Sequence, residues 1–167
     1  RIFLTRIRRQ QMKVTLNAHE YAIAEHTTKM RRDEDRDKGR KDGIPESDSY
    51  DCDLRGSLGE MAFAKGFNKY PDFTMEPGDY DFIVDGYTVD VKTSKGHNNH
   101  LELKSTARKG RCEKFVLITG EYPTYFFRGW IWEKDYWTVC FKKPYEDGAW
   151  SWWVAQANLN PMKTLER

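Results

Sequence analysis

The sequence predicts an α/β fold in one domain covering residues 1–167, and three observations lead to that prediction. Apolar residues recur at helical spacing in two segments of the first half, 13–31 and 51–67. The dipeptide Asp85-Gly86 lies between residues that favour strands, which is typical of a β-hairpin with a two-residue turn. Short runs rich in branched and aromatic residues follow. A chain of this length buries enough surface for a hydrophobic core.

The first predicted helix, 13–31, has Asn17 as a candidate N-cap and turns Tyr21 and Ala24 inward. After it, residues 30–45 carry many charges of both signs and end in a glycine and a proline. Mixed charges of this kind are typical of a solvated helix end or a linker. We therefore expect 30–45 to be a charged linker or arm.

The second predicted helix would be capped by Asp51 or Asp53 and would end near Gly66. Gly59 lies inside it, and a glycine there lowers helix stability relative to alanine. A close approach of another backbone or side chain would explain this glycine. We therefore expect the helix to meet a neighbouring element at Gly59.

A two-residue turn at Asp85-Gly86 fixes the register of the hairpin, so that Phe82 opposes Val89 and Asp81 opposes Asp90. Successive side chains of a strand point to opposite faces, which divides the hairpin into two sets. The set expected in the core is Tyr80, Phe82, Val84, Tyr87, Val89 and Val91. The other face carries Asp79, Asp81, Ile83, Thr88, Asp90 and Lys92.

The rest of the chain is expected to extend the same sheet. Strands are predicted over 101–104, 114–119, 125–131 and 150–155, with a short helix over 133–137 and a last helical turn starting at Pro161. Most of the aromatic residues, which make up 14% of the chain, are expected in the core. Because Trp150, Trp152 and Trp153 cannot all face inward, one of them is a candidate for base stacking or a subunit contact.

The polar face of the hairpin predicts a metal site. Directly opposed residues bring their Cβ atoms to about 4.5–5.5 Å, where like charges repel, so Asp81 and Asp90 need a compensating charge. Mg²⁺ and Mn²⁺ prefer oxygen ligands and are often held by one or two carboxylates. Lys92 adds a positive charge that can orient a water or stabilise phosphate oxygens. If the second helix packs against the hairpin, Glu60 would complete a three-carboxylate site.

A sheet face of ordinary ion pairs explains the same residues about as well, because structural ion-pair networks resemble functional sites. In that interpretation Lys92 pairs with Asp79 across the strands. Glu60 is then a solvated glutamate on a helix. The hairpin taken alone leaves both interpretations open.

Together, Glu60, Asp81 and the triplet Asp90-Val91-Lys92 resemble the motif of the PD-(D/E)XK nuclease superfamily. The resemblance covers roughly residues 54–104. The order of helix, hairpin and triplet is more specific to the family than the residue types of the motif alone. One departure is Tyr80, which stands where the family's name has proline. The resemblance implies a mixed central β-sheet flanked by helices, with a restriction-endonuclease-like core.

The resemblance also implies an activity and roles for individual residues. Asp81, Asp90, the carbonyl of Val91 and Glu60 would hold Mg²⁺ or Mn²⁺, and Lys92 would be the catalytic lysine. The expected function is a metal-dependent endonuclease that hydrolyses phosphodiester bonds in DNA, of the compact kind found in phage genomes. A non-catalytic nucleic-acid-binding module with the same fold, a junction resolvase, an exonuclease, an RNase and an assembly protein remain alternatives. Cutting both strands at one locus would favour a homodimer.

Basic residues follow the triplet and could hold the phosphate backbone of a nucleic acid with little base specificity. The four expected to do so are Lys95, Lys104, Arg108 and Lys109. The net charge of +2 is too small to indicate nucleic-acid binding by itself. A solvated charged loop explains any one of these side chains equally well.

The remaining signals concern compartment and termini. The cysteines Cys52, Cys112 and Cys140 have no metal-ligand spacing and would leave one unpaired in any disulfide scheme, so a reduced, cytoplasmic protein is expected. The sequence has no apolar run long enough to cross a membrane, so no membrane partner is expected. Residues 1–11 precede Met12 and are interpreted as an extension. His97 and His100 lack a third ligand for zinc and are expected in a polar loop.

Overall fold

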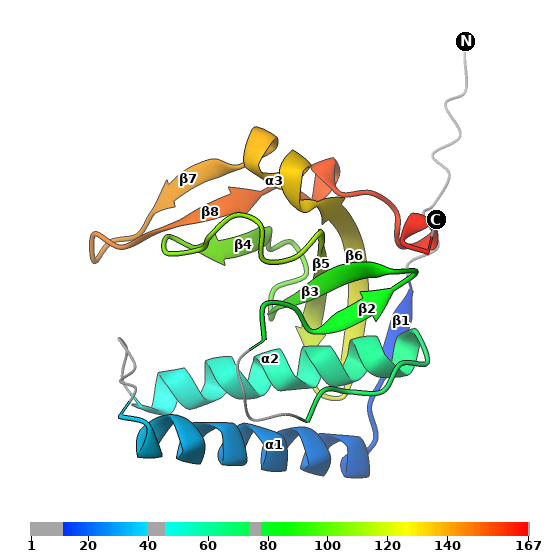
Figure 1. The fold of residues 1–167 in the computed structure, drawn as a ribbon, viewed down its shortest axis with the longest axis vertical. Helices are drawn as coiled ribbons and strands as arrows, with labels where there is room; N and C mark the ends of the chain where they lie inside the picture. Colours follow the sequence, from blue (N-terminus) through cyan, green and yellow to red (C-terminus); the bar gives the residue numbers. More distant parts are fainter. Residues whose placement is uncertain (1–11, 40–45, 74–77, 167) are drawn as a thin grey trace.

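The computed structural model describes residues 12–39, 46–73 and 78–166, and it has a mixed α/β fold (Figure 1). A five-stranded sheet has the order β1-β6-β5-β3-β2, and a three-stranded sheet has the order β4-β8-β7. Strands β3 and β5 are parallel and the other pairs are antiparallel, so the predicted mixed central sheet is confirmed. Its strands are β1 (Lys13–Thr15), β2 (Phe82–Val84), β3 (Tyr87–Ser94), β5 (Lys114–Glu121) and β6 (Thr124–Trp132).

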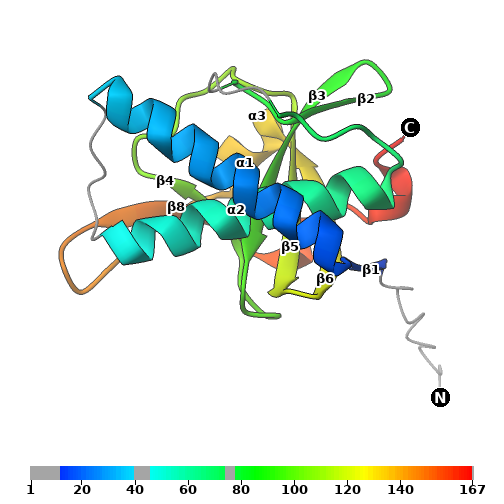
Figure 2. The ribbon, with the colours of Figure 1, turned by 90° about the horizontal axis from the view of Figure 1, so that it is seen from below.

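Two helices lie on one side of the central sheet, and α1 crosses over α2 when they are seen from below (Figure 2). Helix α2 (Glu46–Gly66) packs directly on β3, and α1 (Ala18–Asp37) packs on α2. Phe63 of α2 is fully buried against the sheet, where its ring contacts those of Phe82 and Phe127. The first hydrophobic core therefore lies between α2 and the central sheet.

The second core lies on the opposite face of the central sheet, under α3 (Glu133–Val139) and the small sheet. Strand β5 contributes to both cores, because Val116 and Ile118 face the first while Phe115 and Leu117 face the second. A strand buried on both faces has a continuous apolar run, as residues 115–118 do within the predicted strand 114–119. The prediction of a short helix after β6 is also confirmed.

The first helix begins where the sequence predicted a cap and ends later than expected. The side chain of Asn17 accepts a hydrogen bond from the backbone N–H of Glu20 (2.9 Å), and the carboxylate of Glu20 accepts one from the backbone N–H of Asn17 (2.7 Å). The start of the predicted range is wrong, because Lys13–Thr15 pairs with β6 as strand β1. Ion pairs between side chains one turn apart stabilise the helix as far as Asp37. One of them joins Glu34 and Lys38 at 2.8 Å. The first part of the expected linker, 30–37, is therefore helical, whereas 40–45 and the expected extension 1–11 lie outside the described residues.

Helix α2 ends at Gly66 as predicted, but it begins at Glu46, ahead of both proposed caps. The carboxylate of Asp53 instead contacts Arg32 of α1. The close approach predicted at Gly59 is confirmed, because a Cβ there would lie 1.7 Å from Oγ1 of Thr93. The side chain of Thr93 fills the space between helix and strand at this point, so a residue larger than glycine at position 59 would force α2 away from β3.

The small sheet corrects the prediction that all later strands extend the central one. Strand β8 (Trp150–Val154) pairs with β4 (Leu101–Lys104) and with β7 (Phe141–Pro144), so residues 101–104 and 150–154 belong to a separate sheet. The sequence did not predict β7, because its residues are all exposed and it ends in a proline. Short 3₁₀ helices, Gln156–Asn158 and Met162–Thr164, follow, the second after Pro161 as expected.

Candidate functional site

The β2–β3 hairpin has the turn and register that the sequence predicted. Asp85 and Gly86 both adopt positive φ angles, 49° and 84°, as a two-residue turn of this type requires. Phe82 opposes Val89, and the neighbouring pairs are in the same register. The expected core set is wrong for its two tyrosines: Tyr80 is 40% and Tyr87 36% exposed, because one precedes the paired strands and the other borders the turn.

Asp81 lies just before β2, and its side chain reaches across to β3. Its backbone N–H donates to the carbonyl of Val89 (2.9 Å), and its carboxylate accepts a hydrogen bond from the backbone N–H of Val91 (2.7 Å). Ladder pairing begins at Phe82, so the predicted direct opposition of Asp81 and Asp90 is replaced by this side-chain contact. The consequence is a carboxylate fixed beside the Asp90-Val91-Lys92 triplet.

Lys92 forms an ion pair with Asp90, its Nζ lying 2.7 Å from Oδ1. The alternative pairing of Lys92 with Asp79 is not observed, since Asp79 contacts Arg111 at 3.5 Å. Burial on its own would lower the pKa of Lys92, but the charge of Asp90 outweighs burial and holds this pKa above its usual value. Lys92 is therefore a fixed positive charge at neutral pH.

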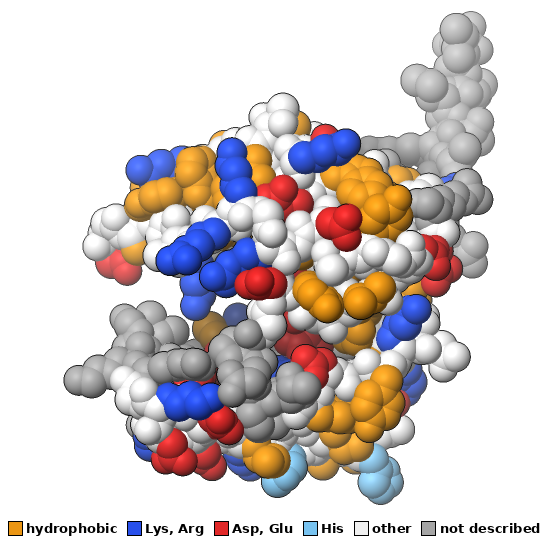
Figure 3. Space-filling model, viewed as in Figure 1, with side chains coloured by type: hydrophobic (Ala, Val, Ile, Leu, Met, Phe, Trp, Pro, Cys, Tyr) orange, Lys and Arg blue, Asp and Glu red, His pale blue; other side chains and the backbone are white. Residues whose placement is uncertain are grey.

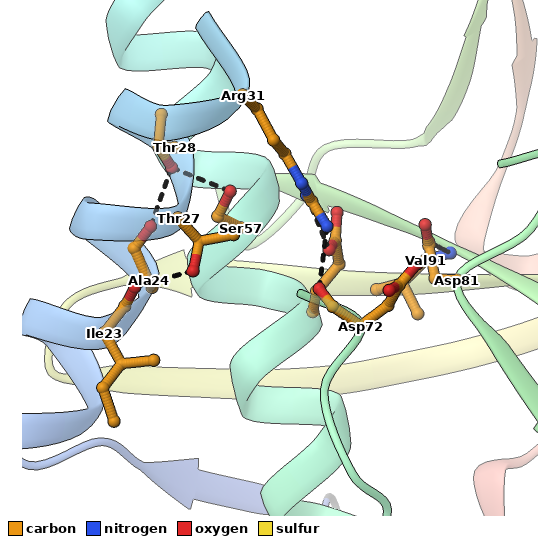
Figure 4. A network of polar contacts seen from close by, with 10 residues as sticks. Ile23, Ala24, Thr27, Thr28, Arg31, Ser57, Asp72, Asp81 and Val91 are labelled. Carbon is orange, nitrogen blue, oxygen red and sulfur yellow. Dashed lines mark hydrogen bonds and ion pairs between the residues drawn. The ribbon is translucent and has the colours of Figure 1, made fainter. Parts of the chain in front are cut away.

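Glu60 reaches the same region from α2, where the helix packs on β3. Its carboxylate is 20% exposed and lies 3.3 Å from Nη1 of Arg31 on α1. Arg31 also donates to the carbonyl of Asp72 (2.8 Å), so one guanidinium joins α1, Glu60 and the loop after α2 (Figure 4). A buried hydrogen bond of 2.8 Å between Thr28 and Ser57 holds the two helices together one turn away (Figure 4).

Arg31 is a site residue that the sequence analysis missed. It lies in the segment interpreted as a charged linker, and nothing in its local sequence marks it. One signal could have identified it. Arg31 follows Thr28 by three residues, so both lie on the same face of the helix, and this face contacts the second helix.

The carboxylates affect one another electrostatically. Burial raises the pKa of Asp81 well above its usual value, and the charges of Glu60 and Asp90 raise it further. Burial also raises the pKa of Glu60, although the nearby Arg31 counteracts part of this effect. Negative charge is thus concentrated where β3 meets α2, and an added cation there would relieve the repulsion.

The oxygen donors suit a magnesium or manganese ion in kind, but they are not assembled into a three-carboxylate cluster. Among the described residues, no three His, Cys, Asp or Glu side chains form a group that could hold a metal. Glu60 is paired with Arg31, and Asp90 is paired with Lys92. Mg²⁺ commonly uses only one or two carboxylates, so Asp81 and Asp90 with the carbonyl of Val91 match its donor requirements.

A cleft of about 840 Å³ joins the hairpin to the small sheet and contains all four predicted catalytic residues, Glu60, Asp81, Asp90 and Lys92. Figure 3 shows the surface hollowed beneath the small sheet, with Lys and Arg side chains along the rim. Of the four predicted phosphate-binding residues, Lys104 and Arg108 line this cleft. The other two are not among the lining residues: Lys95 pairs with Glu121 at 3.1 Å, and Lys109 lies over the ring of Trp137 at 5.5 Å.

Arg55 is a second residue that the sequence analysis missed. It lines the cleft from α2, together with Cys52 and Gly56, which precede Glu60 at helical spacing. Three buried polar atoms of the described residues have no hydrogen-bond partner: Arg55 Nε, Thr93 Oγ1 and His100 Nδ1. All three residues line the cleft. Buried polar groups normally find a partner, so these three atoms along the cleft are exceptions to that rule.

The other sequence-based expectations concern residues away from the carboxylates. His97 and His100 lie in the loop between β3 and β4, as predicted. The cysteines Cys52, Cys112 and Cys140 are free, and burial raises the pKa of the Cys112 thiol to about 12. Within the described ranges, no helix is both long enough and apolar enough to span a membrane.

The fold and the site together define a mixed α/β protein with a charged cleft between a hairpin, a helix and a second, smaller sheet. Comparisons with family models, with curated proteins and with solved structures found no match to this chain.

Proposed function

We propose that this protein is a metal-dependent nuclease of the PD-(D/E)XK type that hydrolyses phosphodiester bonds in DNA. The observation that carries the proposal is the contact between the Asp81 carboxylate and the backbone of Val91 (2.7 Å), inside a cleft that also holds Glu60 and Lys92. Residues from two separate elements, which the motif requires to meet, line one cleft. Arg108 and Lys104 line it as well and match the charge of a phosphate backbone.

Each residue has a role that follows from its surroundings. Asp81, Asp90 and the carbonyl of Val91 would hold Mg²⁺ or Mn²⁺, which when bound supplies a Lewis acid for the phosphate and lowers the pKa of a water. Lys92, charged and held by Asp90, donates hydrogen bonds to the negative charge that develops on the phosphate oxygens. Glu60, whose pKa is raised by burial, is a better proton acceptor than an ordinary glutamate.

A non-catalytic nucleic-acid-binding module is the second proposal. One observation favours it: the Arg31–Glu60 and Lys92–Asp90 ion pairs already compensate two of the carboxylates without a metal. In that case the cleft would bind nucleic acid through its basic residues, and the carboxylates would only stabilise the fold.

The experiment that separates the two is a cleavage assay with Asp90→Asn, which keeps the side-chain shape and removes the charge. Linear, supercoiled, branched and single-stranded DNA and an RNA are incubated with Mg²⁺, Mn²⁺ or EDTA. Asp79→Asn is the matched control, because Asp79 lines the same cleft but pairs with Arg111. The nuclease proposal expects metal-dependent cutting by the parent and the control, and none by Asp90→Asn. Binding without cutting under every condition would support the module instead.

A further inference from the structure

The small sheet has one buried and one open face. Across its strands, Phe141 is aligned with Trp153, and Trp153 with Glu102. In the same way Lys143 is aligned with Ser151 and Ser151 with Lys104, so these six side chains share a face. The alternate residues Leu101, Leu103 and Val154 point the other way and are buried in the second core. On the face that carries Phe141 and Trp153, the outer residues Phe141, Lys143, Glu102 and Lys104 are exposed, whereas Ser151 at its centre is buried.

Aromatic rings and lysines alternate on this open face. Phe141 is 45% and Tyr145 38% exposed, and Trp153 is half-buried between them and β4. The Lys143 ammonium lies 3.8 Å from the centre of the Trp153 ring. His100 places its ring edge-on to Trp153, with ring centres 5.6 Å apart. The result is a surface of aromatic rings in contact with positive charge.

The open face continues into the cleft of the carboxylates. His100, Glu102 and Lys104 belong to this side of the small sheet and also line the cleft, opposite Arg55 and Glu60 of α2. In Figure 1, β4 lies above the first half of α2, and Figure 3 shows the hollow between them. The unpartnered Nδ1 of His100 lies at the junction of the two regions.

We infer that the open face of β4-β8-β7 binds an unpaired strand of nucleic acid and guides it into the cleft. Bases stack on the exposed ring of Phe141, while Lys104 and Lys143, whose ammonium lies over the Trp153 ring, contact the phosphates. A duplex fits this surface less well, because its base faces are covered by neighbouring bases. This inference rests on the proposed nuclease function. It names the substrate of that nuclease as single-stranded DNA or the unpaired arm of a branched DNA.

One acidic residue lies on the same face and would repel phosphate. Glu102 accepts a hydrogen bond from the hydroxyl of Tyr145, which also contacts Ser151 at 2.9 Å. This contact fixes the Glu102 carboxylate beside Ser151, the residue that lies between Lys104 and Lys143 across the strands. The strand is expected to pass with its bases rather than its phosphates over Glu102, since stacking tolerates a charged neighbour better than a phosphate contact does.

The test measures binding of a fluorescent oligothymidylate of about 12 nucleotides, and of a duplex of the same length, by anisotropy in EDTA. Phe141→Ala is expected to weaken single-strand binding about tenfold, the loss typical of one stacked base, and to change duplex binding little. Lys143→Ala is expected to weaken single-strand binding several-fold. It should also reduce the slope of log affinity against log salt concentration by about the amount that one phosphate contact contributes.

Lys142→Ala is the matched control for Lys143→Ala. Lys142 is an equally exposed neighbour on the same strand, and it also lies over a tryptophan, Trp150 at 4.2 Å, but on the opposite face. The inference expects Lys142→Ala to bind as the parent does. Equal losses for the two lysine variants, or tighter binding of duplex than of single strand, would overturn it. Thermal melting of each variant shows whether a loss reflects unfolding, in which case Phe141→Leu, which keeps an apolar residue and removes the ring, replaces Phe141→Ala.

The two proposals fail in different ways. If Phe141→Ala loses single-strand binding while the parent never cuts, the proposal that the open face binds a single strand is supported and the nuclease proposal is rejected. If the parent cuts duplex DNA in an Asp90-dependent manner and Phe141→Ala binds single strands normally, the nuclease proposal is supported. The open face is then not the surface that binds its substrate.

Discussion

The hairpin and the small sheet form two walls of the same cleft, and they are specified in different ways. Strands β2 and β3 are joined by a two-residue turn, so local chemistry at Asp85-Gly86 sets their register and brings Asp81 beside the triplet. Strand β8 instead pairs with β4, which lies far back in the chain, and that pairing depends on the second core. The comparison teaches that the wall of the cleft that carries Asp81 and the triplet is encoded locally, whereas the wall facing it is encoded by tertiary packing.

The largest expected effect tests the hairpin wall. Lys92→Ala should reduce single-turnover cleavage by at least about 100-fold, because it removes the charge proposed to stabilise the phosphate. Metal binding, followed as the thermal shift on adding Mg²⁺, should be retained, since Asp81 and Asp90 remain. A variant that cleaves at the parent rate would remove Lys92 from the mechanism and would leave the hairpin as a structural element.

The next effect concerns the helix that supports this wall. Arg31→Gln should leave the buried Glu60 without its counter-ion and destabilise the protein by about 1–3 kcal/mol near pH 8. The folded-state pKa of Glu60 is raised, so its favourable contribution is present below the unfolded pKa and is lost as pH rises through the folded value. Removing Arg31 raises that pKa further, and the difference between variant and parent should therefore shrink near pH 4.

Urea denaturation at the two pH values measures this difference. Arg36→Gln is a suitable comparison, because Arg36 lies on the same helix in an exposed pair with Asp33 and should have little effect at either pH. A loss of stability for Arg31→Gln that is the same at both pH values would show that its contact with the Asp72 carbonyl, and not the charge of Glu60, is what matters.

An effect of similar size sharpens the contact between helix and hairpin. Gly59→Ala should destabilise the protein by about 1–3 kcal/mol, because the new Cβ collides with Thr93. Gly56→Ala is the control on the same helix: nothing lies within 4 Å of its Cβ position, so alanine should stabilise by about 0.5–1 kcal/mol. Thermal melting of both variants, and of Gly59→Ala with Thr93→Ala, checks whether the collision is the cause.

The smallest effect tests the opposite wall. Lys104→Ala and Arg108→Ala should each weaken DNA binding several-fold and lower its salt dependence, since both residues line the cleft. Lys95→Ala should change binding less than twofold, because Lys95 pairs with Glu121 and does not line the cleft. Anisotropy measurements over a salt series make the comparison. A larger loss for Lys95→Ala would show that the strand leaves the cleft in another direction.

How far the sequence predicted the molecule follows from the range of the interactions involved. The hairpin, its register and the meeting of Asp81 with the triplet were predicted because a turn of two residues leaves no freedom in the pairing. Glu60 was predicted on a helix that packs on β3, and Gly59 supplied an independent reason for that packing. These features need only nearby residues and one contact between elements.

The parts that were not predicted all depend on contacts between distant segments. Arg31, the last residue of the first predicted helix, reaches Glu60 only because α1 lies on α2. The strands 101–104 and 150–154 have ordinary strand sequences, which do not say which sheet they join. Tyr80 and Tyr87 fit the apolar side of the pattern but lie where the paired strands end, so alternation alone could not bury them.

The contact between Gly59 and Thr93 has a consequence for how this sequence can change over time. Two positions separated by more than thirty residues share one volume, so a larger residue at position 59 requires a smaller one at position 93. In any set of relatives the two positions should covary. A glycine directly before the helix glutamate, together with a small residue directly after the triplet lysine, is then a four-position signature for finding distant members in which the rest of the sequence has diverged.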